Sequence, residues 1–203
     1  MKKKGFLVTI VSPSGGGKST ICREILKLNS QMRYSISWTT RPIRGSEVDG
    51  KDYFFTDVET FKEMISQGFF IEFALVHGNY YGTSKDFIEN CLDKGEIIIL
   101  DIDVQGVEKA KKEGYDIVTI FVLPPTEEIL KNRLIARRTD SEDVINQRLI
   151  NARTEIGYLK YYDYLVINDD IDVAISTINS ILKAEMNKYK RYNKPIDEFY
   201  NKE

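Results

Sequence analysis

Three apolar segments dominate the hydrophobic pattern of the chain. They cover Phe6–Val11, Glu96–Ile102 and Ile117–Leu123 and are rich in valine and isoleucine. Continuous segments of this kind are typical of strands that are buried on both faces of a parallel sheet. Tyr164–Ile167 is a plausible fourth strand.

A segment with helical periodicity follows each predicted strand. The alternation of buried strands and helices predicts an α/β fold with a three-layer core, in which the crossovers are right-handed. The predicted helices are Lys18–Leu28, Val104–Lys112, Thr126–Ala136 and Ile171–Tyr189.

Two regions break this alternation. Residues 34–95 contain short aromatic pieces between glycines, which predicts a small mixed α+β insert. Residues 126–156 carry two charged helical patterns around Arg138-Thr139-Asp140-Ser141, which predicts a helical hairpin. Thr139 with Glu142, or Asp140 with Asp143, could cap its second helix. The predicted core is therefore 1–33, 96–125 and 157–203, and its polar end, Lys183–Glu203, is expected to fray.

Composition excludes several classes of protein. The 203 residues are 42% hydrophobic and 30% charged, and the net charge is -2, so no overall basic field attracts nucleic acid or anionic lipid. The apolar segments fall far short of the roughly 18 to 20 residues that span a membrane. Cys22 and Cys91 have no metal-ligand spacing and fit a reducing compartment, so we expect a cytoplasmic protein.

A phosphate-binding motif lies between the first strand and its helix. The segment matches the P-loop pattern, although Ser12 replaces the first glycine. Its glycines let backbone N–H groups converge on an anion, and the helix dipole adds positive potential. Lys18 can reach the β- and γ-phosphates of ATP, and Ser19 can bind Mg²⁺. The expected ATP-binding residues are Ser12, Pro13, Ser14, Gly15, Gly16, Gly17, Lys18, Ser19 and Thr20.

A second metal candidate follows the strand that ends at Leu100. Asp101 lies at the carboxyl end of a core strand, the edge where open α/β sheets bind ligands. It could hold Mg²⁺ through water in the Walker B manner. The alternative is a carboxylate that caps the next helix.

The motifs of the insert narrow the prediction. Ser35-Ile36-Ser37-Trp38-Thr39-Thr40-Arg41-Pro42-Ile43-Arg44-Gly45 precedes Gly50-Lys51-Asp52-Tyr53-Phe54-Phe55. With Phe70–Ala74, Gly78–Thr83, Leu100–Gly106 and Asn168-Asp169-Asp170, this series resembles the guanylate kinase family over about residues 5 to 185.

The resemblance implies transfer of the γ-phosphoryl group of ATP to GMP, and to dGMP, giving ADP and GDP for purine nucleotide metabolism and GMP recycling. It implies a P-loop core, a GMP-binding insert at 34–95 and a lid at 126–156, with Mg²⁺ accompanying ATP. The partners would be these small molecules, with no nucleic acid or membrane, and the oligomeric state stays open. An ionised phosphate oxygen is already a nucleophile, so no general base is needed.

The resemblance also assigns residues by motif position. The acceptor phosphate would be held by Arg41, Arg44, Tyr53 and Tyr81, and guanine would be read by Ser37, Glu72, Thr83 and Asp103. A carboxylate such as Glu72 can accept from both N1–H and the 2-amino group of guanine, which adenine cannot supply. Asn168 would lie near the adenine of ATP. Lys18, Arg41, Arg133, Arg137 and Arg148 are the expected catalytic residues.

Two features and two rival functions stay open. Arg138 stands where the family usually has glycine, and His77, beside Gly78, is expected in an exposed loop. One rival is a catalytically inactive module that binds phosphopeptides, which would be expected to have a degraded cradle. The other is a GTP-hydrolysing switch, for which Asn193-Lys194 and Asp197 give an imperfect guanine motif.

Overall fold

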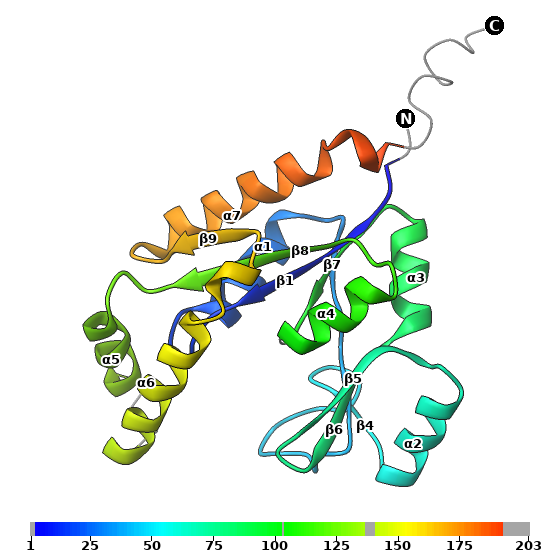
Figure 1. Ribbon diagram of the computed structural model, residues 1–203, viewed down its shortest axis with the longest axis horizontal. Coiled ribbons are helices and arrows are strands. Elements are labelled where there is room, and N and C mark those ends of the chain that lie inside the picture. Colours follow the sequence, from blue (N-terminus) through cyan, green and yellow to red (C-terminus); the bar gives the residue numbers. More distant parts are fainter. Residues whose placement is uncertain (1–2, 103, 137–140, 193–203) are drawn as a thin grey trace, which may run out of the picture. The chain divides into compact units, whose positions relative to one another are not determined.

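The computed structural model describes residues 3–102, 104–136 and 141–192 (Figure 1). One sheet has the strand order β2-β7-β1-β8-β9, with β2 parallel to β7 and β8 parallel to β9. The prediction of an α/β fold with a parallel sheet is therefore confirmed. The strands are β1 (Phe6–Val11), β2 (Met32–Tyr34), β7 (Ile97–Leu100), β8 (Ile117–Leu123) and β9 (Tyr164–Ile167).

The burial of these strands follows their sequence. Strand β7 is buried throughout, and β1 and β8 are buried up to their last residue, because branched apolar side chains cover both faces. At one edge, β9 buries only Val166. At the other edge, β2 was missed by the sequence pattern because it is short and buries only Met32.

The helices after the sheet strands lie close to the predicted ranges. One prediction about them is wrong: α6 follows the extended residue Ser141, so neither Thr139 nor Asp140 stands at its N-cap. Thr139 and Asp140 themselves lie outside the described residues. The helices are α1 (Lys18–Leu28), α4 (Val104–Lys112), α5 (Glu127–Ala136), α6 (Glu142–Ile156) and α7 (Ile171–Met186).

A second sheet has the strand order β4-β3-β6-β5. Its β5–β6 hairpin is antiparallel and turns at His77 and Gly78, which both have positive φ (49° and 80°). Such turns favour glycine, and the exposed His77 adopts the strained first position. The elements of this region are β3 (Trp38–Thr39), β4 (Phe54–Phe55), α2 (Val58–Ser66), β5 (Phe70–Val76), β6 (Asn79–Ser84) and α3 (Lys85–Asp93).

The chain divides into two compact units. Unit 1 contains Val8–Ser30 and Val118–Glu203, and unit 2 contains Lys2–Leu7 and Gln31–Ile117. In unit 1, helices α5 and α6 pack through a cluster that includes Leu130, as expected for a helical hairpin. The boundaries of a separate core, insert and lid stay a prediction.

The end of the described chain is better ordered than the sequence indicated. Arg191 and Glu185 are 2% and 1% exposed, and Arg191 donates to the Glu185 carboxylate at 3.0 Å and to its carbonyl at 2.7 Å. The Tyr164 hydroxyl donates to the same carboxylate at 2.6 Å. The expected fraying is therefore wrong for residues 183–192, because a buried ion pair holds them; residues 193–203 lie outside the described part.

Two further observations concern membrane-spanning helices and cysteines. Within the described ranges, no helix combines the length and the apolar character needed to cross a bilayer. Cys22 and Cys91 are free thiols, and both are buried. Burial raises the pKa of the Cys91 thiol, and the nearby Glu96 carboxylate raises it further.

Candidate active site

The phosphate cradle, residues 12–20, joins β1 to α1 in unit 1. Gly15 and Gly17 have φ of 95° and 103°, which glycine adopts without steric cost. Gly16 has no room for a side chain, since a Cβ there would lie 1.8 Å from the Ser12 hydroxyl. The cradle is therefore a tight turn with nearly bare backbone at the start of a helix, which is the arrangement that binds phosphate.

Asn168, just after β9, is hydrogen-bonded to the backbone of the cradle. Its side-chain amide donates to the Gly16 carbonyl at 2.7 Å, and the residue is 2% exposed. A Cβ on Gly17 would lie 2.5 Å from the same amide nitrogen. The sequence predicted an adenine contact for Asn168; the structure adds a direct bond to the cradle backbone.

Two of the predicted arginines reach the same region from the helical hairpin. Arg133 of α5 donates to the carbonyls of Asn168 and Asp169 at 3.0 and 3.3 Å. Arg148 of α6 donates to the hydroxyl of Ser14. Unit 1 thus has an open pocket of about 460 Å³ beside the cradle, whose lining includes Gly15, Gly17, Thr20, Arg133 and Asn168. Arg148 contacts the cradle at Ser14.

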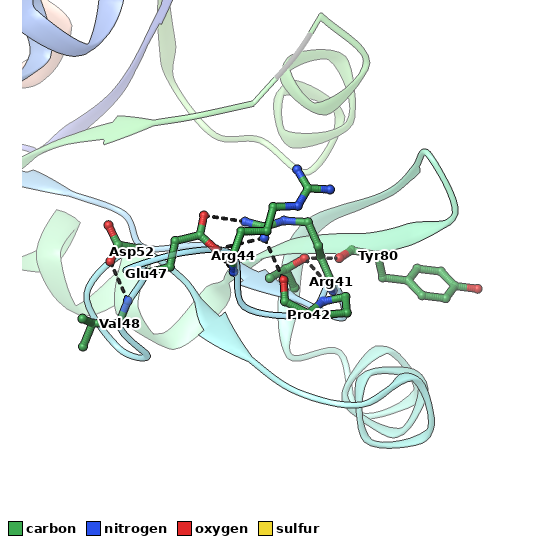
Figure 2. A network of polar contacts seen from close by, with 8 residues as sticks. Arg41, Pro42, Arg44, Glu47, Val48, Asp52 and Tyr80 are labelled. Carbon is green, nitrogen blue, oxygen red and sulfur yellow. Dashed lines mark hydrogen bonds and ion pairs between the residues drawn. The ribbon is translucent and has the colours of Figure 1, made fainter. Parts of the chain in front are cut away.

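Arg41 in unit 2 is held by a carboxylate that the sequence analysis did not single out (Figure 2). Its Nη1 and Nη2 donate to Glu47 Oε2 and Oε1 at 2.9 and 2.8 Å, and Nη1 also donates to the Pro42 carbonyl at 2.8 Å. Arg41 is only 6% exposed. The hydrogen bonds to Glu47 raise the pKa of Arg41, although its burial opposes them, and lower the pKa of Glu47.

Two tyrosines complete this group on the other side of Arg41. The guanidinium lies over the Tyr53 ring at 5.1 Å and also interacts with the Tyr81 hydroxyl. Burial, and after it the charge of Asp101, raises the pKa of Tyr53, so its hydroxyl stays a neutral donor. The structure thus brings Arg41, Tyr53 and Tyr81 together, as the sequence predicted.

Arg44 is joined to this group through its backbone. Its N–H donates to Glu47 Oε2 at 2.8 Å, and the residue is exposed. Glu47 therefore fixes both arginines of the motif, one by its side chain and one by its backbone. The sequence does contain a signal for Glu47. It is a glutamate three residues after Arg44, in a loop that must hold two positively charged side chains.

Glu72 and Thr83 face each other on the β5–β6 hairpin. They are register partners, and the Thr83 hydroxyl donates to Glu72 Oε1 at 2.6 Å. Their exposed fractions are 7% and 1%. Ser37, in the same unit, is half-buried, and its carbonyl accepts from the Phe54 N–H at 2.9 Å. A buried carboxylate held by a hydroxyl suits a partner that donates two hydrogen bonds.

The candidate metal ligands are exposed oxygen groups. Ser19 lies at the start of α1, and Asp101, which follows β7, accepts from the Tyr34 hydroxyl at 3.2 Å. Within the described ranges, no group of three His, Cys, Asp or Glu could hold a metal by itself. Two predicted site residues, Asp103 and Arg137, lie outside the described residues, as do Arg138 and the Asn193-Lys194 motif.

Comparisons with known proteins agree with these motifs. The family described as guanylate kinase matches residues 4–185. The guanylate kinase of Clostridioides difficile (strain 630) is 44% identical, covering 99% of this chain and 98% of its own, and that of Rickettsia typhi is 46% identical, covering 95% and 98%. The crystal structure of guanylate kinase from Anaplasma phagocytophilum superposes with a TM-score of 0.74 at 35% identity, covering 94% and 91% of the two chains. The chain therefore belongs to the guanylate kinase family.

Proposed function

We propose that this protein transfers the γ-phosphoryl group of ATP to GMP, and also to dGMP, giving ADP and GDP. Membership of the guanylate kinase family supports the reaction. The observation that carries the choice of acceptor is the buried carboxylate of Glu72, which is held by Thr83 at 2.6 Å. Guanine offers two adjacent donors to such a carboxylate, whereas adenine offers a lone pair at N1.

The acceptor phosphate is bound, in this proposal, by Arg41, Arg44, Tyr53 and Tyr81. A phosphate dianion repels ATP unless fixed positive charge neutralises it, and a guanidinium can do so with two parallel hydrogen bonds. Glu47 occupies the Nη1–Nη2 edge of Arg41 and leaves other donors of the guanidinium for the phosphate. Because an acceptor oxygen is already ionised, no side chain has to remove a proton.

The donor phosphates are bound by the cradle in unit 1. Backbone N–H groups and Lys18 hold the β- and γ-phosphates, and Arg133 and Arg148 stabilise charge on the group in transfer. Both arginines now donate to cradle residues or to Asn168 and Asp169, which keeps them beside the phosphate site. We assign Arg137 the same role from the family motif alone.

Magnesium is the metal that fits the oxygen groups present. Mg²⁺ prefers oxygen ligands, retains several waters and is usually held by one or two protein groups together with nucleotide phosphates. In this proposal Ser19 is its ligand at the cradle, and the assignment of Asp101 rests on the sequence motif alone. Asp103 would join Glu72 at the base. When bound, the ion neutralises charge on the phosphates.

The place of action follows from these substrates. We infer that the protein works in the cytoplasm, where ATP and GMP are present and thiols stay reduced, and that it returns GMP to the purine nucleotide pool. The free thiols of Cys22 and Cys91 support a reducing compartment.

A coupled assay of ADP formation, run with ATP, Mg²⁺ and a panel of nucleoside monophosphates, tests this proposal. GMP and dGMP should be turned over, and AMP, CMP and UMP should not. Lys18→Ala should lower kcat by about 10² to 10³, the size expected when one fixed charge-stabilising group is lost. Turnover with AMP as fast as with GMP would disprove the acceptor assignment, and ATP hydrolysis unaffected by GMP would support the switch alternative.

A further inference from the structure

Glu155 is a charged residue near the end of α6 that the proposed reaction does not use. On this helix Ile145, Arg148, Leu149, Ala152 and Glu155 are buried or half-buried, while the residues between them are exposed. Glu155 therefore lies on the inward face, two turns after Arg148. Arg148 contacts the cradle through Ser14, so this face of α6 is turned toward the cradle in unit 1.

The surroundings of Glu155 are unusual for a carboxylate. Its Oε2 atom is buried and has no hydrogen-bond partner among the described residues. Burial raises the pKa of Glu155, and the positive charge that opposes this effect is Lys18 of the cradle. A buried carboxylate oxygen without a hydrogen-bond partner destabilises a protein, and the positive charge of Lys18 offsets part of this cost.

Lys18 lies in a region of concentrated positive potential. The start of α1, the glycine N–H groups and the side chains of Arg133 and Arg148 all add to it. A triphosphate neutralises this potential when it is bound. Before a nucleotide binds, a carboxylate on the inward face of α6 can neutralise part of this positive potential.

We propose that Glu155 is a positioning residue for the cradle. While no nucleotide is bound, Glu155 balances the charge of Lys18. When a nucleotide binds, Lys18 interacts with its phosphates instead. Glu155 then competes weakly with the nucleotide. The inference rests on the proposed function, because it takes Lys18 to be a phosphate-binding residue. It goes beyond that function in naming a carboxylate that tunes donor affinity without touching the donor.

The test is the affinity for magnesium ADP, which the enzyme cannot turn over alone, measured by titration calorimetry. Glu155→Gln keeps the shape of the side chain and removes its charge, so binding should tighten about twofold to fivefold, the range of a weak interaction between charges. A residue with a merely structural role would weaken binding or leave it unchanged. Glu142→Gln, an exposed residue of the same helix, removes the same charge and should change affinity much less.

A double-mutant cycle separates this inference from the proposed function. In a Lys18→Ala background, Glu155→Gln should have no effect, because its partner is gone. If Lys18→Ala alone left ADP affinity intact, the role given to Lys18 would fail. If Lys18→Ala weakened binding but Glu155→Gln did not tighten it, only the present inference would fail. Glu155→Met repeats the test without a charge, and loss of the fold in both variants would identify Glu155 as a support of α6 and overturn the proposal.

Discussion

At the scale of single residues, the two parts of the proposed acceptor site use carboxylates in different ways. Glu72 is buried on the β5–β6 hairpin and accepts from the Thr83 hydroxyl, which keeps a charged acceptor at the position where the proposed function places the base. Glu47 accepts from Arg41 at both oxygens and from the Arg44 N–H, so its capacity is largely used within the protein. The first arrangement suits recognition, and the second suits positioning.

Glu72→Gln should reduce the preference for GMP over AMP. The variant keeps the shape, but it loses the charge and turns one acceptor into a donor, which opposes the guanine N1–H. A buried carboxylate left unpaired by adenine can give discrimination on the order of 10⁴, so the ratio of kcat/KM for the two substrates should fall by at least about 10². The same ratio in variant and wild type would show that Glu72 does not read the base.

Glu47→Gln should lose stability in a way that depends on pH. The pKa of Glu47 is lowered in the folded protein, first by its hydrogen bond with Arg41, so its contribution is present above the unfolded value of 4.5 and is lost as the pH falls through the folded value. The wild type should therefore have the higher Tm at pH 7. The difference should shrink below about pH 4.5, and a constant difference from pH 7 to pH 3 would contradict the linkage.

At the scale of elements, the cradle depends on contacts from other elements of unit 1. Asn168, after β9, donates to Gly16, and a Cβ on Gly15 would lie 3.1 Å from both Leu130 and Leu134 of α5. The turn is therefore enclosed by neighbouring side chains as well as shaped by its glycines. An added methyl group in this turn must displace one of these neighbours.

Gly16→Ala should greatly weaken ATP binding, because its Cβ would lie 1.8 Å from the Ser12 hydroxyl and 3.0 Å from the Pro13 carbonyl. Ser12→Gly removes the first clash and leaves the second. The double variant Ser12→Gly/Gly16→Ala should therefore recover part of the affinity, as measured by calorimetry with ATP. Equal affinity in the two variants would mean that the Ser12 hydroxyl does not limit the space.

Much of the element structure could be predicted, and the failures have physical causes. Strands such as β1 were predictable because burial on both faces leaves an uninterrupted apolar segment in the sequence. Strand β2 was not, because its stability comes from pairing with β7.

Charged residues near the end of the described chain were harder to predict. The region after Leu182 looked like a polar tail, yet Glu185 and Arg191 are buried as a pair, and a charge pattern does not show pairing. Likewise, the motif indicated Arg41 but not the carboxylate that holds it.

At the scale of the whole molecule, the residues proposed for the two substrates fall in different compact units. Lys18, Arg133, Arg148 and Asn168 belong to unit 1, whereas Arg41, Glu72 and Tyr81 belong to unit 2. Each set is held by contacts within its own unit, from Asn168 with Gly16 to Thr83 with Glu72. In the proposed function, each unit therefore carries the contacts for one nucleotide.

Hydrogen exchange should resolve the two sites separately. GMP alone should slow amide exchange in unit 2, around the β5–β6 hairpin and the loop of Arg41. ADP with Mg²⁺ should slow exchange in unit 1, around the cradle and α6, because a ligand that binds only the folded state opposes local opening. Protection of the cradle by GMP alone would contradict this assignment.

The buried thiols give each unit its own chemical reporter. Cys22 lies in unit 1 and Cys91 in unit 2, and their exposed fractions are 7% and 6%. A thiol reagent reaches a buried cysteine only when the surrounding structure opens, and the raised pKa of Cys91 slows its reaction further in the folded state. Mass spectrometry of peptides containing each cysteine can therefore follow the opening of both halves of the enzyme in one labelling experiment, without any engineered probe.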